Sequence, residues 1–194
     1  MRQGLIAAFA AVIAFAGCGP KAEEAAASSP ADGWVVDKAE SRLEFTATQT
    51  DREFSGRFET FEASIAFDPA DLSSSTIEVV VDMTSAKTGD RQRDAALPTS
   101  DWFAAKAFPK ALYRASEIVS TGEGAYEAHG ALTIRDATRD LVLPFTLAID
   151  GARAIADGEA SLVRTDFGVG QGEFQTDEWV GFDVTVTFHI EATR

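Results

Sequence analysis

Cysteine and histidine are nearly absent from this chain of 194 residues, which contains only Cys18, His129 and His189. A single cysteine cannot form an internal disulfide. Both histidines take outward positions in strand-like segments, so we expect them to be solvated. No close spacing of His, Cys and carboxylate suits zinc. We therefore predict no metal site and no Cys–His catalysis, because Cys18 also lies in a leader segment.

Basic residues are also few, with 17 Lys and Arg against 31 Asp and Glu and a formal net charge of −14. Binding of nucleic acid needs clustered Lys and Arg that displace counterions, so this class of function is excluded. The excess of acid is typical of a soluble exported domain. The motifs G-x-S-x-G, G-x-x-x-x-G-K and G-x-G-x-x-G are absent, which leaves no sign of a nucleophile elbow or a phosphate loop.

The one long apolar run, Leu5–Ala16, stands at the N-terminus in "MRQGLIAAFAAVIAFAGC". It follows one basic residue and precedes small residues, which is typical of a secretory signal over residues 1–17, and it is too short to span a membrane. Cleavage after Ala16 would follow the A-x-A rule, whereas "FAGC" resembles a bacterial lipobox and would leave Cys18 lipidated. We favour the lipobox and predict a periplasmic lipoprotein. Gly19 in place of an aspartate favours an anchor in the outer membrane.

Residues 18–33 are rich in Ala, Ser, Glu and Pro, and after Cys18 they include no apolar residue larger than alanine. Such a segment cannot bury enough surface to order itself, and we interpret it as a flexible tether. The folded domain is predicted to cover residues 34–194.

Apolar and polar residues alternate with a period of two through the whole predicted domain, as in "FDVTVTFHIEA" near its end. Each segment of this kind has one apolar and one polar face, which is typical of antiparallel strands. Pro144 falls on the outward face of its segment and indicates an edge or a bulge. Eight strands are predicted, at about 43–48, 53–67, 77–83, 111–119, 126–134, 141–149, 159–167 and 182–192.

The second of these strands has a fault in its register. Its inward residues are even-numbered as far as Phe58 and odd-numbered from Phe61 onward. A bulge or a sharp bend must therefore lie between the two phenylalanines. A long bent strand and burial on one face favour a closed barrel over a flat sandwich.

The segment "TGDRQRDAALPTSDWF", residues 88–103, departs from the alternation. Ser100 is expected to cap a short helix that begins at Asp101. That helix would end before Pro109, since the residue before a proline favours extended backbone. The segment is thus predicted to form a long loop and a helix start across one end of the barrel.

Five segments share a pattern with one known family: "WVVDKAESRLEFTA", "GRFETFEASIAFD", "RDAALPTSDWFAAKAFP", "GALTIRDATRDLVLP" and "RTDFGVG". In this order, over about residues 34–192, they resemble the YceI-like family of exported bacterial proteins that bind polyisoprenoids and related lipids. The resemblance implies an all-β fold, an eight-stranded antiparallel lipocalin-like barrel with one short helix. It also implies an apolar tunnel that holds a long lipid tail, with no reaction assigned. Ala96, Trp102 and Asp136 depart from the family pattern, which bears on ligand preference and not on the fold.

Phenylalanine, with 14 copies against two tyrosines, brings apolar area without a polar group. Small inward residues such as Ala47, Ala63 and Ala128 alternate with the inward phenylalanines and leave space between them. From the residues alone, plain packing and a ligand cavity both stay open, and the resemblance favours the cavity. The residues expected to bind ligand are Phe45, Phe58, Phe61, Phe145, Phe167, Phe182 and Phe188 in the tunnel, with Arg93, Asp94 and Trp102 near its mouth and Phe103 beside Trp102 in the same loop.

Arg164 interrupts the alternation beside Leu162. We expect its side chain to point inward, because a strand residue of this parity faces the barrel interior. A buried arginine needs a partner. The partner would be either Asp166, in a structural salt bridge, or the polar head of a ligand.

The predicted function is non-covalent binding of a long apolar lipid, of polyisoprenoid, isoprenoid quinone or fatty-acyl type, for storage or transport in the periplasm. We expect no catalysis and no cofactor other than the bound lipid. The expected partners are that lipid and, through Cys18, the membrane, and a homodimer is left open. Two alternatives remain: a hydrolase that uses the carboxylates of Asp94 and Asp101, and a ligand-free surface module of the stress response.

Overall fold

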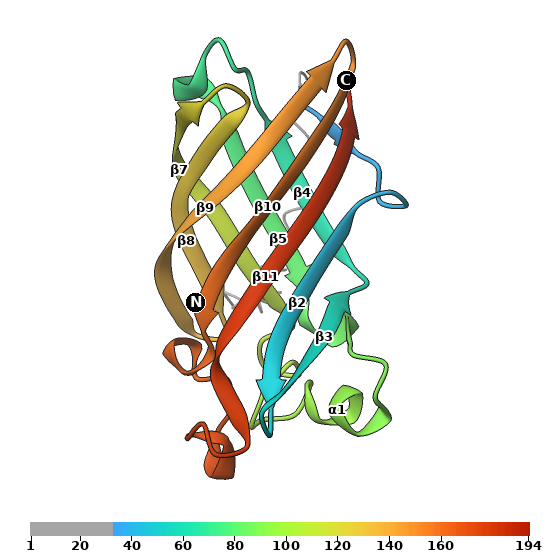
Figure 1. Ribbon diagram of the computed structural model, residues 1–194, viewed down its shortest axis with the longest axis vertical. Coiled ribbons are helices and arrows are strands. Elements are labelled where there is room, and N and C mark those ends of the chain that lie inside the picture. The colour runs from blue at the N-terminus through green and yellow to red at the C-terminus, as the bar shows by residue number, and fades with distance from the viewer. Residues whose placement is uncertain (1–32) are drawn as a thin grey trace, which may run out of the picture.

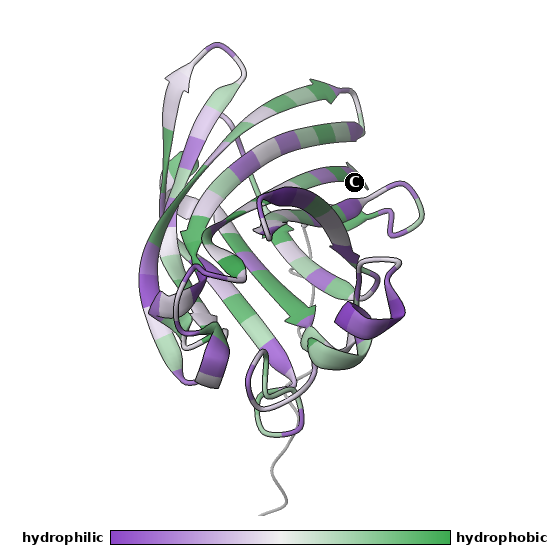
Figure 2. Cartoon of the chain, turned by 60° about the horizontal axis from the view of Figure 1, so that its bottom comes forward, coloured by the Kyte–Doolittle hydropathy of each residue, from purple (hydrophilic) through white to green (hydrophobic). Residues whose placement is uncertain are grey.

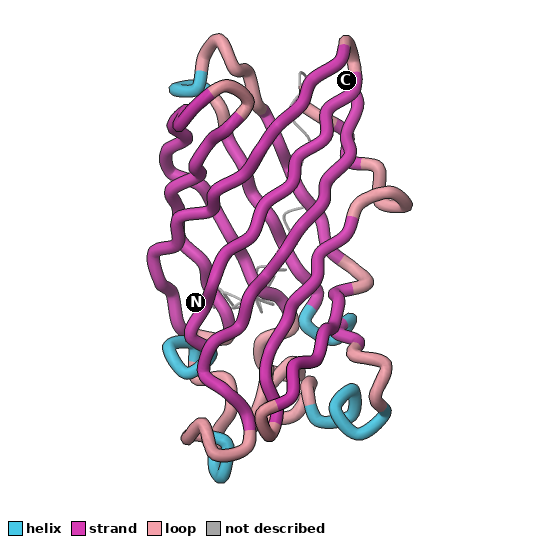
Figure 3. Tube along the Cα trace, in the orientation of Figure 1, coloured by secondary structure: helices cyan, strands magenta, loops and turns pink. Residues whose placement is uncertain are grey.

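The structure is a computed structural model that describes residues 33–194. The predicted signal peptide, the lipidation site at Cys18 and the tether up to residue 32 lie outside the described residues. Strands form the wall of one elongated body, and the helical turns and loops gather at its two ends (Figures 1 and 3). The strands are β1 Val35–Val36, β2 Arg42–Gln49, β3 Arg52–Phe58, β4 Phe61–Ala66, β5 Thr76–Asp82, β6 Ala86–Lys87, β7 Lys110–Gly122, β8 Ala125–Ile134, β9 Ala137–Asp150, β10 Arg153–Val163 and β11 Val180–Thr193. The helices are α1 Arg91–Ala96 and four 3-10 turns: η1 Leu72–Ser74, η2 Met83–Ser85, η3 Arg164–Phe167 and η4 Gly172–Phe174.

One antiparallel sheet curls round in the order β4-β5-β7-β8-β9-β10-β11-β2-β3-β6. Strands β3 and β4 are successive parts of one bent stretch, and β5 and β6 are separated only by η2. The pairs β4–β5 and β3–β6 therefore bring the two ends of this order together. Strand β1 pairs with β11, and Trp34 beside it bridges to Ile65 of β4. The predicted all-β antiparallel barrel is confirmed. Its strand segments number eleven, because the predicted strand over 53–67 is divided into β3 and β4, and the short strands β1 and β6 were not predicted.

The predicted fault in register is also found. Strand β3 ends at Phe58 and β4 begins at Phe61, and both rings face the interior. The two residues between them are held by Ser85, whose carbonyl accepts from Glu59 N at 3.2 Å and whose Oγ accepts from Thr60 N at 3.1 Å. This break lets inward residues of opposite parity follow each other in one strand.

The one α-helix lies earlier than predicted. Helix α1 covers Arg91–Ala96, whereas the sequence led us to expect a helix from Asp101. Asp90 is the cap: its side chain accepts from Gln92 N at 2.9 Å and from Arg93 N at 3.0 Å. These bonds satisfy two backbone donors that the first turn leaves free. No helix among residues 33–194 has the length and hydropathy needed to cross a bilayer.

The segment expected to be helical forms turns instead. Ser100 Oγ reaches only the side chain of Asp101, at 3.5 Å, and accepts from no backbone N–H. The chain folds back so that Phe103 N donates to the carbonyl of Leu97 at 2.9 Å. Ala104 then adopts a left-handed backbone with φ of 49°, which ends any regular helix.

The predicted strand over 159–167 starts and ends earlier than expected. Strand β10 covers Arg153–Val163, and the 3-10 turn η3 follows it. The turn ends at Gly168, a left-handed position with φ of 64° that favours glycine. Chain reversal at this point turns Arg164 and Phe167 toward the interior.

Pairing between β9 and β10 covers only part of their length. Their ladder runs from the hairpin down to the pair Phe145–Gly158 and stops there. Residues 137–144 of β9 stay paired with β8, and residues 159–163 of β10 stay paired with β11. The ladder ends next to Pro144, which confirms the edge or bulge predicted at this proline. Residues 137–144 of β9 and residues 159–163 of β10 are thus not paired with each other. We call these two segments the seam.

Candidate functional site

The barrel encloses an apolar cavity of about 240 Å³. An engineered cavity of about 150 Å³ with Leu, Ile and Phe walls stays dry and binds benzene, so this space is large enough for a hydrocarbon. Seen from the end that carries α1, the strands alternate between hydrophobic and hydrophilic residues (Figure 2). Among the lining residues, only Trp34, Tyr113 and Arg164 carry a polar group on the side chain.

Each of these polar groups already has a protein partner. Trp34 Nε1 donates to the carbonyl of Phe67 at 3.0 Å, and the Tyr113 hydroxyl donates to the carbonyl of Ala128 at 2.7 Å. Burial raises the pKa of Tyr113 to about 12, because the phenolate would lose its hydration. The hydroxyl thus stays neutral near neutral pH. Apart from Arg164, the wall offers a ligand no polar group.

Arg164 points inward, as predicted, and only 4% of the residue is exposed. Its hydrogen-bond partners are four backbone carbonyls, and the expected salt bridge to Asp166 does not form. Burial lowers the pKa of its guanidinium, and the nearby charge of Asp177 acts in the opposite direction. Nε donates to Gly181 at 2.8 Å, Nη1 to Val169 at 2.9 Å, and Nη2 to Thr176 at 2.9 Å and Val180 at 2.7 Å.

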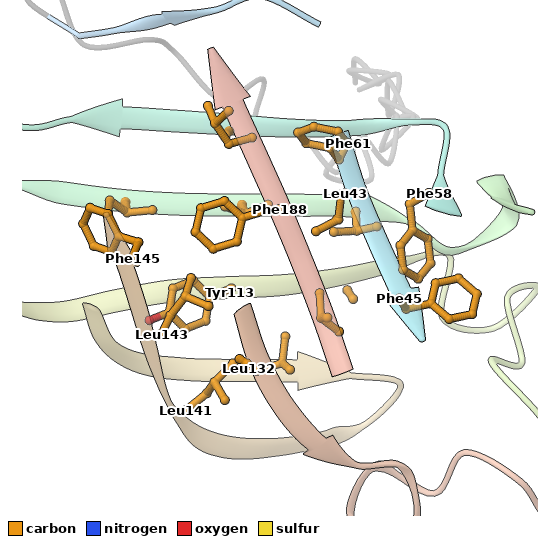
Figure 4. A pocket seen from close by; sticks show the side chains of 18 of the residues that line it. Leu43, Phe45, Phe58, Phe61, Tyr113, Leu132, Leu141, Leu143, Phe145 and Phe188 are labelled. Atoms are coloured by element: carbon orange, nitrogen blue, oxygen red, sulfur yellow. The ribbon is translucent and has the colours of Figure 1, made fainter. Parts of the chain in front are cut away.

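Most of the predicted tunnel residues do line the cavity, and Figure 4 shows several of their rings around it. Near the end that carries α1 the rings form a chain, with centroids 5.4 Å apart for Phe45–Phe58 and 6.1 Å for Phe58–Phe103. Whether these side chains contact a lipid remains a prediction. The predicted residues found in the lining are Phe45, Phe58, Phe61, Phe103, Phe145, Arg164, Phe167 and Phe188.

Phe182 does not line the cavity, although its parity along β11 predicted an inward ring. The register between β11 and β2 shifts between Val180 and Val184. The alternation of inward residues from Val184 onward therefore does not extend back to Phe182. The residue is 36% exposed. Its ring lies 5.4 Å from the guanidinium of Arg164. Phe182 therefore packs behind Arg164, outside the tunnel.

Arg93 and Asp94 also lie outside the lining. Arg93 Nη1 donates to Gln49 Oε1 at 3.2 Å, and its guanidinium covers the ring of Phe54 at 4.6 Å. Asp94 Oδ1 accepts from the N–H of Thr88 at 2.7 Å and from its hydroxyl at 2.8 Å. These bonds hold the pKa of Asp94 below its usual range. Both side chains thus order the loop around α1, at one end of the barrel, and their expected contact with a lipid head group stays a prediction.

Trp102 belongs to a closure at the same end of the barrel and does not line the cavity either. Its ring lies 5.0 Å from that of Phe174. Arg135 Nη1 donates to the carbonyl of Trp102 at 3.0 Å and also to that of Gly168. The two segments that meet here, residues 97–109 and 164–179, are called the lower loops.

A model of the YceI-like domain matches residues 34–192. The chain belongs to the YceI-like family. A UPF0312 protein of Vibrio cholerae is 29% identical over 120 residues, which is 59% of this chain and 64% of that protein, slightly less than two-thirds of its length. A UPF0312 protein of Pseudomonas syringae pv. tomato is 26% identical over 169 residues, with 82% of this chain and 88% of that protein covered.

Solved structures of similar proteins agree with the fold. BcnA of Burkholderia cenocepacia superposes with a TM-score of 0.79 and 32% identity over 82% of this YceI-like chain and 100% of that chain. A polyisoprenoid binding domain from Saccharophagus degradans, implicated in plant cell wall breakdown, gives a TM-score of 0.64 with 12% identity. This second comparison covers 84% of this chain and 98% of the other, and it bears on the fold alone.

Several lining residues of this YceI-like domain were not named among the predicted site residues. The aliphatic members lie at inward positions of the same alternation, so the pattern already contains the signal that would identify them. Arg135 gave no signal in the sequence, because its role depends on two loops far apart in the chain. The aliphatic lining residues include Leu43, Leu132, Leu141, Leu143, Leu162 and Val186.

Proposed function

We propose that this YceI-like domain binds a long apolar lipid chain, of polyisoprenoid, isoprenoid quinone or fatty-acyl type, non-covalently in its tunnel, and that it stores or carries the lipid in the periplasm. The observation that carries this proposal is the composition of the wall. Hydrocarbon side chains line a cavity in which Trp34 and Tyr113 are already bonded to backbone carbonyls. Such a wall suits a hydrocarbon chain and penalises a polar ligand.

The hydrophobic effect supplies the binding energy in this proposal. Each methylene moved from water into the tunnel contributes about 0.8 kcal/mol. The neighbouring structure named as a polyisoprenoid binding domain shares the fold, and by analogy with that protein we propose a prenyl chain as one class of ligand. We propose binding without catalysis, since Asp94, one of the two carboxylates considered for hydrolysis, is held by Thr88 in the loop around α1.

The proposed site of action rests on the first 18 residues. A lipid on Cys18 would anchor the domain in the outer membrane, and residues 19–33 would serve as its tether. Replacing Cys18 by serine is then expected to move the protein from the membrane pellet to the soluble periplasmic fraction. Loss of labelling by a clickable palmitate should accompany this shift. An unlabelled wild-type protein that is already soluble would contradict the anchor and leave the tunnel proposal intact.

Filling the tunnel is the direct test of lipid binding. Ala63 lines the cavity from β4, and an indole at this position would occupy a large part of the 240 Å³. We expect Ala63→Trp to weaken binding of cis-parinaric acid at least about tenfold, since the loss of contact for two methylenes already costs that much. Fluorescence titration gives the affinity, and geranylgeraniol should displace the probe from the wild type.

The matched control is Ala70→Trp, which adds the same indole at an exposed position between β4 and η1. It should bind the probe like the wild type. Native mass spectrometry of gently extracted wild-type protein should show a bound lipid, and less of it in the Ala63→Trp variant. If the wild type binds neither the probe nor any co-purified lipid, the proposed function is wrong.

A further inference from the structure

The upper end of the tunnel, where the β9–β10 hairpin and the C-terminus lie in Figure 1, is closed by aromatic side chains. Trp34 is bonded to the carbonyl of Phe67 and covered by the guanidinium of Arg194 at 4.6 Å. The rings of Phe67, Tyr126 and Phe145 pack on one another, with centroids 5.1, 6.1 and 5.5 Å apart. A lipid could pass here only if this cluster came apart.

The lower end, which carries α1, is closed by the lower loops. The carbonyl of Asp101 accepts from the N–H groups of Gly170 at 2.8 Å and Gln171 at 2.7 Å. Arg135 bridges the same two loops, and Arg164 binds four carbonyls within and just after the second one. Opening this end would break several hydrogen bonds, among them the two from Arg135 and the two to the carbonyl of Asp101.

No registered pair between β9 and β10 extends into the seam below Phe145–Gly158. Pro144 has no N–H, and its carbonyl points at β10, where a Cβ on Gly158 would lie 2.5 Å from that oxygen. Both backbone groups of a residue point to the same side of an antiparallel strand. The nitrogen of Pro144 thus also faces β10 but cannot donate, and the ladder ends there. Below this point β9 curves away from β10, as Figure 1 shows.

The seam leads directly from the surface into the tunnel. Leu141 and Leu143 of β9 line the cavity on one side, and Ala160 and Leu162 of β10 line it on the other. On the outer surface Val142 is 45% exposed, an apolar residue at the rim. The turn η3 packs against β9 and bounds the seam from below. Only side chains stand between the tunnel and the outside along this stretch.

We propose that the lipid chain passes into and out of the tunnel sideways, through the seam between residues 137–144 and 159–163. The proposal rests on the proposed function. A chain that slides in laterally needs side chains to rotate but leaves every backbone ladder intact. The polar head of the lipid then remains outside, at the seam, because Trp34 and Tyr113 inside are already bonded to the protein.

A reversible chemical cross-link across the seam, called the seam clasp, tests the route. Extending the Phe145–Gly158 register places Val142 opposite Ser161, and both side chains are exposed. A Cys18→Ser protein with Val142→Cys and Ser161→Cys is joined by a reducible bis-maleimide. Stopped-flow fluorescence of cis-parinaric acid should then show association and dissociation both slowed about tenfold or more. The dissociation constant should change little, because a blocked route alters rates and not the two end states. Reduction should restore the rates.

Two control clasps locate the effect. Glu159→Cys with Thr187→Cys joins β10 to β11, which are already paired at these positions, and it should leave the rates unchanged. Asp101→Cys with Gln171→Cys joins the lower loops and should also leave them unchanged. If this lower clasp slows exchange and the seam clasp does not, the proposal is overturned.

A single substitution provides a second measurement that needs no cross-link. Pro144→Thr restores an N–H that faces β10 and extends the ladder into the seam. Both rate constants should fall together at an unchanged dissociation constant. Unchanged rates in this variant and in the seam clasp would refute the lateral route while the probe still binds. Absence of equilibrium binding in the wild type would instead refute the proposed function, and the route with it.

Discussion

Replacing Arg164 by alanine should lower the free energy of unfolding by roughly 3–5 kcal/mol, because a buried charged group leaves its partners without compensation. Four carbonyls of the segment from residue 169 to 181 would lose their donor at once. Water cannot reach this site readily, since the side chain that would be removed is almost fully buried. Lysine should not rescue the loss, because its compact ammonium cannot reproduce the planar fork of donors.

Urea unfolding followed by tryptophan fluorescence measures this effect. Arg114→Ala is the matched control: that arginine pairs with Glu78 at 2.6 Å on the outer face, with 64% of its side chain exposed. Its removal should cost less than about 1 kcal/mol. An Arg164→Ala protein as stable as this control would show that the carbonyls are hydrated in the variant, and that the arginine has no stabilising role.

Replacing Trp34 by alanine should lower the free energy of unfolding by about 3–5 kcal/mol, the range for removing a buried aromatic side chain. Only 4% of Trp34 is exposed, and its indole packs in the same apolar cluster as Phe67 and Phe145. The variant also leaves the carbonyl of Phe67 without its donor. Because Trp34 closes the upper end, removal of its side chain should both lower the stability of the domain and enlarge the cavity.

Trp179→Ala is the control for this second variant, since it removes the same side chain at a position that is 47% exposed. Its effect should stay within about 0.5 kcal/mol. Thermal unfolding by circular dichroism compares the two. If Trp34→Ala and Trp179→Ala have the same melting temperature, Trp34 does not hold the upper end together.

The sequence predicted the barrel because its evidence was local and repeated. The switch of parity between Phe58 and Phe61, and the proline at position 144, were each visible within one strand. Both corresponded to a break in pairing in the structure. The family resemblance, now supported by the match over residues 34–192, added the tunnel, which alternation alone left undecided.

Local evidence was insufficient where the chosen signal was not the one used or where partners were distant. Ser100 was expected to cap the helix, but α1 is capped by Asp90, whose carboxylate accepts from two free N–H groups. Phe182 followed the alternation, yet a register shift against β2 placed it behind Arg164. The closure by Arg135 joins residues 33 positions apart on either side, a relation that no short pattern records.

A tunnel wall in which Trp34 and Tyr113 are already bonded to the backbone also limits how finely the domain can choose its cargo. A site built on hydrogen bonds rejects a wrong ligand strongly, whereas an apolar pocket separates ligands that differ by one methylene by only about 1–3 kcal/mol. The domain would therefore discriminate between ligands by the width and length of the hydrocarbon chain and not by functional group. Its cargo in the cell would be set by which slender hydrocarbon chains are most abundant.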